Sequence, residues 1–256
     1  MRVVVTGGRG NLGREVMRAL TERGHQPVNA SRRSGVDVRS GAGLDAVLKR
    51  ADAVVHTADT LRPWEFRAVT LGGAQRLADA LAALDRRVPL VYISIVGVDR
   101  SPYAYYRMKH AAELAISERP IAATVVRATQ FHSLAAAMVG MRPGPFIPAV
   151  RGMRLQPVDI RWVGERLAQI ATDAPPQGFT RHRDLSGPDR FATQELALRV
   201  ARHAARRHPR VVSIPPVGGT LRAFADGIAL PAPDAEIGGE SFAAWLERQP
   251  PRLPRR

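Results

Sequence analysis

A glycine-rich turn close to the start of the chain constrains the fold more than any other feature of the sequence. Residues 1–6 are mostly β-branched and predict a buried strand, and Gly7, Gly10 and Gly13 follow at intervals of three residues. In such a turn the first glycine permits a tight bend, the second lets a pyrophosphate approach the backbone, and the third lets the next helix pack closely on the strand. The turn therefore predicts a phosphate-binding crossover from a strand to a helix.

The sequence contains the helix that this turn requires. Leu12, Val16 and Leu20 recur at four-residue spacing, which is typical of an amphipathic helix. Asn11 is placed to cap its first turn, and Gly24 is placed to end it. The N-terminus of such a helix presents amide donors and positive potential to an anion. A turn without a ligand is the alternative, but the context on both sides favours a dinucleotide.

Strands and helices continue to alternate along the first half of the chain. We expect strands at 27–30, 53–56, 90–95 and 122–127, and helices at 44–49, 66–84 and 105–117. This alternation predicts an α/β, doubly wound parallel sheet with its ligand beyond the carboxyl ends of the strands. Proline and glycine then become dense at 142–148 and 215–219. We therefore interpret residues 1–256 as one domain, in which residues 131–256 contribute most of a small cap on the substrate side.

Charge and composition narrow the possible partners. The formal net charge is +15, but arginine is scattered along the whole chain, and its densest groups lie at 199–210 and 252–256. Solvated surface charge explains this pattern, so we expect no nucleic-acid partner. The chain has no cysteine, its seven histidines show no metal-ligand spacing, and no apolar run approaches the roughly 20 residues that span a bilayer. We expect a cytoplasmic protein with a small-molecule substrate, no metal and no membrane partner, and a homodimer stays open.

The end of the second expected strand bears on the choice of dinucleotide. An acidic residue there would bind the ribose 2′-hydroxyl of NAD, whereas this chain has Ser31, Arg32 and Arg33. Guanidinium groups pair with phosphate through forked hydrogen bonds, so these residues favour NADP(H) over NAD(H). The alternative is that both arginines are ordinary solvated charges in an arginine-rich chain.

These features resemble the short-chain dehydrogenase/reductase superfamily, in the extended and atypical branch that includes NmrA-like NAD(P)H-binding proteins. The resemblance covers nearly the whole chain and is carried by the glycine spacing and by residues 36–38, 52–58, 91–94, 105–109 and 126–131. It implies a Rossmann-type fold. The dinucleotide contacts that it implies are Thr6, Gly7, Gly10, Asn11, Leu12, Gly13, Ser31, Arg32, Arg33, Asp37, Val38, Thr57, Ala58, Lys109, Ala128 and Phe131.

The resemblance also implies a catalytic group. Tyr105 falls at the position of the acid/base, Lys109 at that of its modulator, and Ser94 at that of the hydroxyl that orients a substrate carbonyl. Four residues of helix place Tyr105 and Lys109 on one face, so the ammonium can act on the phenol. Tyr103 and Tyr106 stay open as alternative acids, and the interval from Ser94 to Tyr105 is short for the family.

Three further expectations follow. Some relatives use an asparagine on the preceding helix to hold a water, and Thr70 is the residue of this chain that falls near that position. We interpret His132 as a polar residue lining a loop, and we expect the three tryptophans to pack in the core or the cap, at positions 64, 162 and 245.

For function, the sequence favours an NADPH-dependent oxidoreductase that reduces a carbonyl, quinone or enone group of a small apolar metabolite. The alternative from another class is an NADP(H)-binding, NmrA-like sensor or regulator without turnover. A sugar-nucleotide epimerase or dehydratase ranks third, because such enzymes generally have a larger C-terminal domain.

Overall fold

A parallel β-sheet runs through the middle of the molecule. The computed structural model describes residues 1–140, 146–204 and 209–250. Part of the proline-rich segment 142–148, part of the arginine-dense group 199–210 and all of the group 252–256 therefore lie outside the described residues. The sheet consists of β1 (Arg2–Thr6), β2 (Gln26–Ala30), β3 (Ala53–His56), β4 (Leu90–Ile95), β5 (Ala123–Ala128), β8 (Phe179–Arg181), β9 (Leu185–Ser186) and β12 (Glu236–Ile237). The strand order is β12-β9-β5-β4-β3-β1-β2, with β8 paired to β5, and every pair is parallel.

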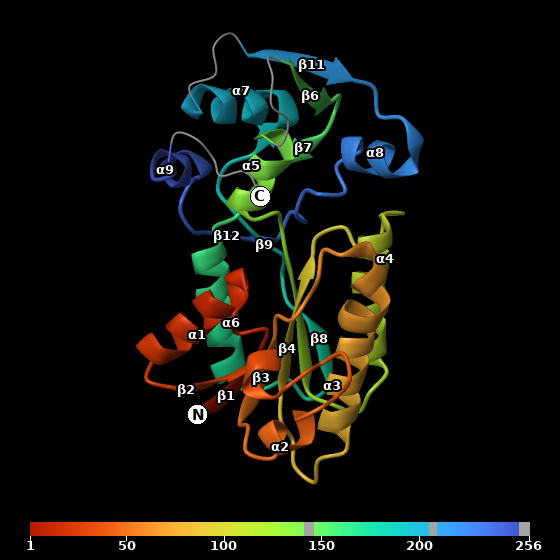
Figure 1. The fold of residues 1–256 in the computed structure, drawn as a ribbon, viewed down its shortest axis with the longest axis vertical. Helices are drawn as coiled ribbons and strands as arrows, with labels where there is room; N and C mark the ends of the chain where they lie inside the picture. Colours follow the sequence, from red (N-terminus) through yellow and green to blue (C-terminus); the bar gives the residue numbers. More distant parts are fainter. Residues whose placement is uncertain (141–145, 205–208, 251–256) are drawn as a thin grey trace.

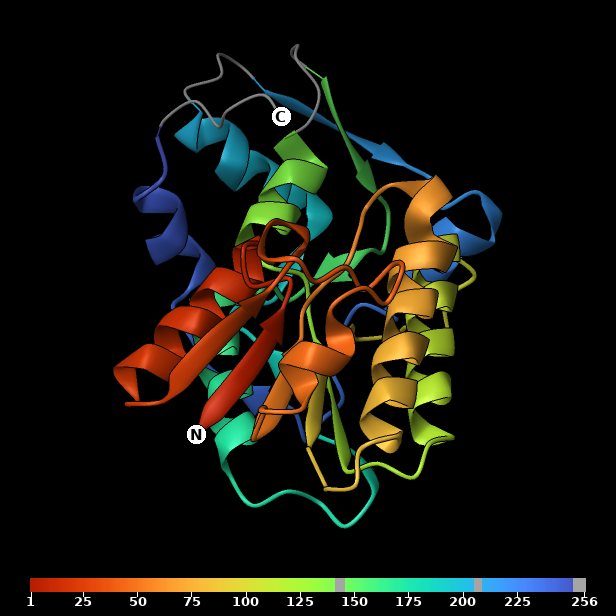
Figure 2. The same ribbon diagram turned by 60° about the horizontal axis from the view of Figure 1, so that its bottom comes forward.

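Helices cover both faces of this sheet (Figures 1 and 2). The first face carries α1 (Asn11–Glu22) and α6 (Ile160–Thr172), and the second carries α2 (Leu44–Leu48), α3 (Gly72–Ala82) and α4 (Ala104–Ser117). Successive side chains of a strand point to opposite faces, so Val3 and Val5 pack with α1 and α6 while Val4 packs with α2 and α3. All three valines are fully buried, each stabilising the fold by about 1.5–3 kcal/mol. The predicted Rossmann-type, doubly wound α/β fold is confirmed.

Most element boundaries fall close to the predicted ones, with two differences. Helix α1 has Gly10 as its N-cap and Asn11 as its first residue, and no side-chain bond caps it, so the capping role predicted for Asn11 is wrong. The helix expected from residue 66 begins as a π-helical segment, η3 (Phe66–Leu71), before α3 continues it. Gly24 ends α1 as predicted, with a positive φ of 76°.

The second half of the chain builds a cap beyond the carboxyl ends of the strands (Figure 1). Its elements are α5 (His132–Gly140), β6 (Phe146–Val150), β7 (Arg154–Leu155), β10 (Phe191–Ala192), α7 (Thr193–His203), β11 (Arg210–Ile214), α8 (Gly218–Ala225) and α9 (Phe242–Glu247). Two small sheets, β6 with β11 and β7 with β10, lie in this cap. The same half also supplies α6, β8, β9 and β12 to the central layer, which the sequence analysis did not anticipate.

The tryptophans do not all behave as predicted. Trp245 packs in the cap, with its ring centroid 5.4 Å from that of Phe242, and Trp162 packs on the side of the sheet that carries α1 and α6. Trp64 is 78% exposed, so the expectation that it packs in the core or the cap is wrong. It lies in η2 (Pro63–Glu65), a short turn that runs over the surface after β3.

Within the described part of the chain, no helix is both long and apolar enough to cross a membrane.

Candidate functional site

The carboxyl ends of β1, β3 and β4 meet where the winding of the sheet reverses. The chain passes from β1 to β2 on one side and returns to place β3 on the other side of β1. The register aligns Thr6 with His56 and His56 with Tyr92, so the residues that follow these strands share one edge of the sheet. Ligands of open α/β sheets bind at such a reversal.

The glycine turn is built as its spacing predicts. Gly7 has φ of 70°, and a Cβ atom there would lie 2.7 Å from the backbone of Ala58. A Cβ atom on Gly13 would lie 2.2 Å from the Gly7 carbonyl oxygen, so both positions exclude a side chain. Gly10 is exposed, and a Cβ atom there would meet only that same oxygen, at 3.1 Å. The turn therefore leaves bare backbone at the N-terminus of α1, which fits a dinucleotide pyrophosphate.

Beside this turn, Thr6, His56, Thr57 and Tyr92 form a hydrogen-bonded and stacked group, which we call the floor of the site. The amide and hydroxyl of Thr57 both donate to the Thr6 carbonyl oxygen, at 3.1 and 2.7 Å. Thr6 Oγ1 lies 2.5 Å from His56 Nδ1, and the His56 ring stacks on Tyr92 at 5.5 Å. Burial, aided by the charge of Lys109, lowers the pKa of His56 to about 3. His56 is therefore neutral and forms part of the scaffold.

The end of β2 lies next to the same turn, because the Gly7 amide donates to the Ala30 carbonyl oxygen at 3.0 Å. Ser31 caps a short 3-10 helix, η1 (Arg32–Ser34), and its amide donates to Ser34 Oγ at 2.9 Å. Arg32 and Arg33 are exposed. The structure thus places two guanidinium groups at the surface beside the predicted pyrophosphate site.

Asp37 and Val38, predicted to lie at the adenine, follow η1 outside the strands of the described chain. The Asp37 carboxylate accepts a hydrogen bond from the Arg39 amide at 2.8 Å, and Val38 is buried. These residues therefore begin a hydrogen-bonded turn, in which the Gly41 amide donates to the Asp37 carbonyl oxygen at 2.8 Å.

Tyr105 and Lys109 lie on one face of α4, and both contact the carboxylate of Asp59. Tyr105 Oη donates to Asp59 Oδ2 at 2.7 Å, and Lys109 Nζ lies 3.2 Å from the same oxygen. Lys109 is 3% exposed, donates to the Ile93 carbonyl oxygen at 2.7 Å, and lies 4.3 Å from the centre of the Tyr92 ring. The structure therefore brings the predicted acid and its predicted modulator together.

Asp59 is the residue that the sequence analysis missed. It follows Thr57 and Ala58, two predicted cofactor contacts, and its side chain is 22% exposed. Its Oδ1 accepts from Thr70 Oγ1 at 2.6 Å and from the Thr60 amide at 2.8 Å. The resemblance placed Thr70 near a position where some relatives hold a water, and in the structure Thr70 is a hydrogen-bond donor to Asp59. The sequence alone does not show that the partner of Thr70 is a carboxylate.

Opposing effects act on the pKa of Asp59. Burial raises the pKa of this carboxyl, but the charge of Lys109 and the hydrogen bonds from Thr70, Tyr105 and the Thr60 amide outweigh it. The net pKa lies below its ordinary value, so Asp59 is ionised at neutral pH.

The structure separates the three neighbouring tyrosines. Tyr106 is buried toward the cap, where its ring lies 5.6 Å from Phe224 and its hydroxyl accepts from Gln130 Nε2 at 3.4 Å. Burial raises the pKa of Tyr106 to about 12. Tyr103 precedes α4 and is 43% exposed. Among these three hydroxyls, that of Tyr105 contacts Asp59.

The remaining predicted residues lie at the ends of β4 and β5. Ser94 Oγ is buried and has no hydrogen-bond partner among the described residues, so nothing joins it to Tyr105. Ala128 pairs with Ile95 at the end of β5, and Phe131 bridges to Val158. His132, expected to line a loop, is instead buried as the first residue of α5, with Nε2 3.1 Å from the Glu240 carbonyl oxygen.

A buried ion-pair network holds the loop between Ser94 and Tyr105. The Arg127 guanidinium donates to both carboxylate oxygens of Glu113, at 3.0 and 2.6 Å, and lies 3.0 Å from Asp99 in that loop. Glu113 lies one helical turn after Lys109 on α4. The network therefore ties β5 and α4 to the loop that leads to Tyr105.

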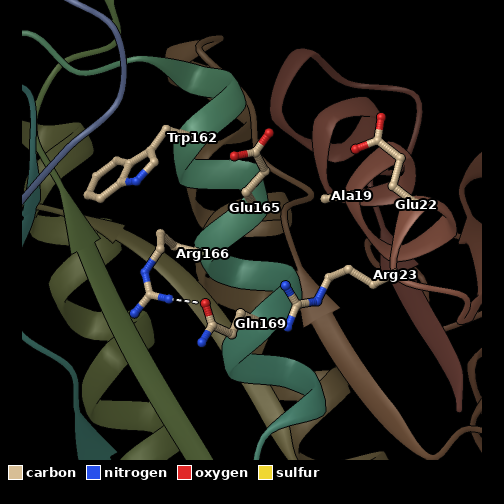
Figure 3. Close-up of a pocket in the computed structure, with 7 residues that line it drawn as sticks. All are labelled: Ala19, Glu22, Arg23, Trp162, Glu165, Arg166 and Gln169. Carbon is tan, nitrogen blue, oxygen red and sulfur yellow. Dashed lines mark hydrogen bonds between the residues drawn. The ribbon is translucent and has the colours of Figure 1, made fainter.

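A groove lies away from this site. It lies between α1 and α6 and is lined by Ala19, Glu22, Arg23, Trp162, Glu165, Arg166 and Gln169 (Figure 3). Glu165 is already paired with Arg18 at 2.8 Å, and Arg166 with Glu236 at 2.6 Å. The groove borders the last turns of α1, at the opposite end of that helix from the glycine turn, and we do not treat it as the functional site.

A protein-family model matches the first part of the chain. Residues 3–115 match the NAD dependent epimerase/dehydratase family. The matched segment contains the glycine turn, Asp59, Tyr105 and Lys109. This segment, which makes up less than half of the chain, is similar to that family. Among curated proteins, none matches the sequence.

Solved structures share the fold across nearly the whole chain. The NADPH-dependent quinone oxidoreductase QOR2 from Escherichia coli, complexed with NADPH, aligns with a TM-score of 0.73 at 14% identity, covering 96% of this chain and 98% of that one. The UDP-glucose 4-epimerase of Thermus thermophilus, in complex with NAD, gives 0.67 at 19% identity, with 96% and 98% covered. The dTDP-4-dehydrorhamnose reductase of Bacillus anthracis, in complex with NADP, gives 0.64 at 18%, with 96% and 97% covered. At these identities the likeness establishes the fold alone.

Proposed function

We propose that this chain is an NADPH-dependent oxidoreductase that reduces a carbonyl, quinone or enone group of a small apolar metabolite. The observation that carries the proposal is the cluster of Tyr105, Lys109 and Asp59 at the strand ends, on the same edge of the sheet as the glycine turn. A reduction needs a hydride, which the bound nicotinamide supplies, and a proton donor held at the substrate oxygen.

The residues divide between binding and chemistry. Amides in the first turn of α1 hold the pyrophosphate, and the glycines before that helix let the pyrophosphate approach the backbone. Tyr105 provides the proton, and Lys109 is the buried cation beside it. Ser94, whose buried hydroxyl is unpaired among the described residues, orients the substrate oxygen. An unpaired buried hydroxyl is costly, so a ligand that accepts its hydrogen bond would be stabilised there.

A turnover assay tests the proposal directly. Oxidation of NADPH would be followed against a panel of quinones, ketones and enones, with Tyr105→Phe and Lys109→Ala as the test variants. Removing the proton donor is expected to lower kcat about 10²- to 10⁴-fold. Tyr103→Phe is the matched control, because Tyr103 is exposed and its ring lies 6.3 Å from that of Tyr105. Equal loss in both tyrosine variants would overturn the assignment of the acid.

The preference for NADP(H) is the second part of the proposal, and it is supported by the exposed Arg32 and Arg33 at the end of β2. A charge-assisted hydrogen bond contributes about 1.5–3 kcal/mol, so Arg32→Ala should weaken NADPH binding about 10- to 150-fold. Binding of NADH, which lacks the 2′-phosphate, should be unchanged. Calorimetric titrations measure both, with the exposed Arg100→Ala as control. Equal affinities of the wild-type protein for NADPH and NADH would refute this part.

One observation favours a second candidate, an NADP(H)-binding NmrA-like sensor without turnover. Tyr105 and Lys109 are both already bonded, Tyr105 to Asp59 and Lys109 to Asp59 and the Ile93 carbonyl oxygen, so a substrate would have to compete with these bonds. This candidate replaces the first if NADPH binds tightly and no member of the panel is reduced.

A further inference from the structure

The Asp59 carboxylate is contacted by side chains or amides from three segments of the chain. It accepts hydrogen bonds from two hydroxyls, Tyr105 Oη and Thr70 Oγ1, and from the Thr60 amide, and it also pairs with the Lys109 ammonium. These donors come from α4, from η3 and from the loop after β3. Four donors around two oxygens fill most of the acceptor capacity of a carboxylate. Its orientation is therefore determined from several sides.

We propose, resting on the oxidoreductase function above, that Asp59 is a positioning residue that holds the Tyr105 hydroxyl as a protonated donor and places the Lys109 ammonium beside it. Asp59 touches neither substrate nor dinucleotide in this role. It acts through the two side chains that it orients.

The effect of Asp59 on Lys109 follows from burial. A cation that is 3% exposed needs a partner, and Asp59 supplies the opposite charge at 3.2 Å. The Ile93 carbonyl oxygen and the Tyr92 ring add a hydrogen bond and a cation–π contact. The ammonium is thereby held at the carboxylate oxygen that also accepts the hydrogen bond from Tyr105.

The effect on Tyr105 runs against the usual influence of a neighbouring lysine. Burial and the negative charge of Asp59 raise the pKa of Tyr105, while Lys109 opposes them only in part. A phenolate would lie 2.7 Å from a carboxylate, and two like charges at that distance are strongly disfavoured. Tyr105 therefore remains a phenol throughout the neutral range.

A phenol is the form that a reductase needs. The substrate carbonyl oxygen takes the proton of Tyr105 Oη as its carbon accepts the hydride, and a solvent proton moves to Tyr105 Oη in the same step, so that no lasting phenolate forms beside the Asp59 carboxylate. Asp59 stays ionised throughout. A tyrosine kept protonated by Asp59 serves reduction over a wider alkaline range than one whose pKa is lowered by lysine alone.

The test has to distinguish the titration of Tyr105 from that of the other titratable groups that interact with Asp59. These other groups are Lys109 of α4, Tyr92 of β4 and His56 of β3. Burial also raises the pKa of Tyr92 well above its usual value, and His56 stays neutral. The chain has four tyrosines, so the absorbance of a phenolate can be assigned to one of them by substitution.

The experiment is an alkaline absorbance titration of the full chain without dinucleotide or substrate, in a Tyr103→Phe background that removes the exposed tyrosine. Adding Asp59→Asn should lower the midpoint of one tyrosine by about one to three units. Adding Tyr105→Phe as well should abolish that signal. An unchanged curve in the Asp59→Asn protein, or a new signal that survives Tyr105→Phe, overturns the proposal.

A second pair of variants covers the case in which Asp59→Asn does not fold, because it leaves Lys109 buried without a counter-ion. Lys109→Met and Lys109→Met/Asp59→Asn are compared in the same background, and the double variant removes both charges. Tyr105 should titrate at a lower pH in the double variant than in the single one, and equal midpoints refute the proposal. Because no step of the titration requires turnover, its failure is distinct from failure of the proposed function.

A pH profile adds a functional readout. NADPH-dependent reduction by the wild-type protein should stay level through mildly alkaline pH, whereas Asp59→Asn should lose kcat on the alkaline side, where Tyr105 ionises. A merely structural role for Asp59 would lower kcat at all pH values alike and would overturn the proposal.

Discussion

Replacing Arg127 by methionine is the sharpest test of how the site is held in place. The Arg127 side chain is 6% exposed and forms a forked pair with Glu113, whose side chain is 7% exposed. Arg127→Met would leave the Glu113 carboxylate buried without a counter-ion and would release Asp99. Breaking a buried pair in this way costs about 3–5 kcal/mol. At about 2–4 °C per kcal/mol for a chain of this size, the expected loss in Tm is about 6–20 °C.

The assay is urea unfolding followed by circular dichroism, with two controls. Arg100→Met removes a neighbouring arginine whose side chain is 59% exposed and 4.0 Å from Asp99, and it should change the free energy of unfolding by less than about 0.5 kcal/mol. Arg127→Met/Glu113→Leu removes both buried charges and should cost less than the single variant. The reasoning is refuted if Arg127→Met costs under about 1 kcal/mol, or if the double variant is destabilised as much as the single one.

Three further predictions concern the turn, the floor and the surface. Gly13→Ala should abolish dinucleotide binding in a calorimetric titration, because the new Cβ atom would lie 2.2 Å from the Gly7 carbonyl oxygen; retained affinity would contradict the assignment of the turn. The free energy of unfolding should fall as the pH drops below 6.5, because the unfolded chain then takes up a proton at His56. The folded chain takes up that proton only near pH 3, so the loss should reach about 2 kcal/mol at about pH 5. His56→Gln should flatten that slope in urea titrations at several pH values, and an unchanged slope would show that another group is responsible. Trp64→Ala should change Tm by less than about 2 °C, since the indole is 78% exposed, and a larger loss would show that Trp64 packs in solution.

The parts of the fold that the sequence predicted are those in which local chemistry decides the structure. The strand before Gly7, the helix with Leu12 and Val16, and the close approach at Gly13 each depend on neighbours within a few residues. Tyr105 and Lys109 were found for the same reason, because one helical turn separates them.

The missed features depend on contacts between distant segments. Asp59 meets Tyr105 across 46 positions of sequence, and nothing near Asp59 signals that a lysine will be buried beside it. Likewise, strands β8, β9 and β12 are only two or three residues long, so they show no periodicity. Strands β8 and β9 cover the edge that β5 would otherwise present, and β12 pairs with β9. The capping role expected of Asn11 was wrong because the helix begins one residue earlier than a cap at that position requires.

The route of the chain between the sheet and the cap limits how this molecule can move. After β5 the backbone enters the cap, returns to form α6, β8 and β9, enters the cap again, and comes back once more for β12 before α9. One of these returning segments, α6, packs closely on α1 at Gly164, where a Cβ atom would lie 2.6 Å from that of Glu15. Several segments therefore connect the cap to the sheet, and any closure of the cap over the sheet would have to bend all of them together. The cap should accordingly move against the sheet less freely than a domain joined by one linker.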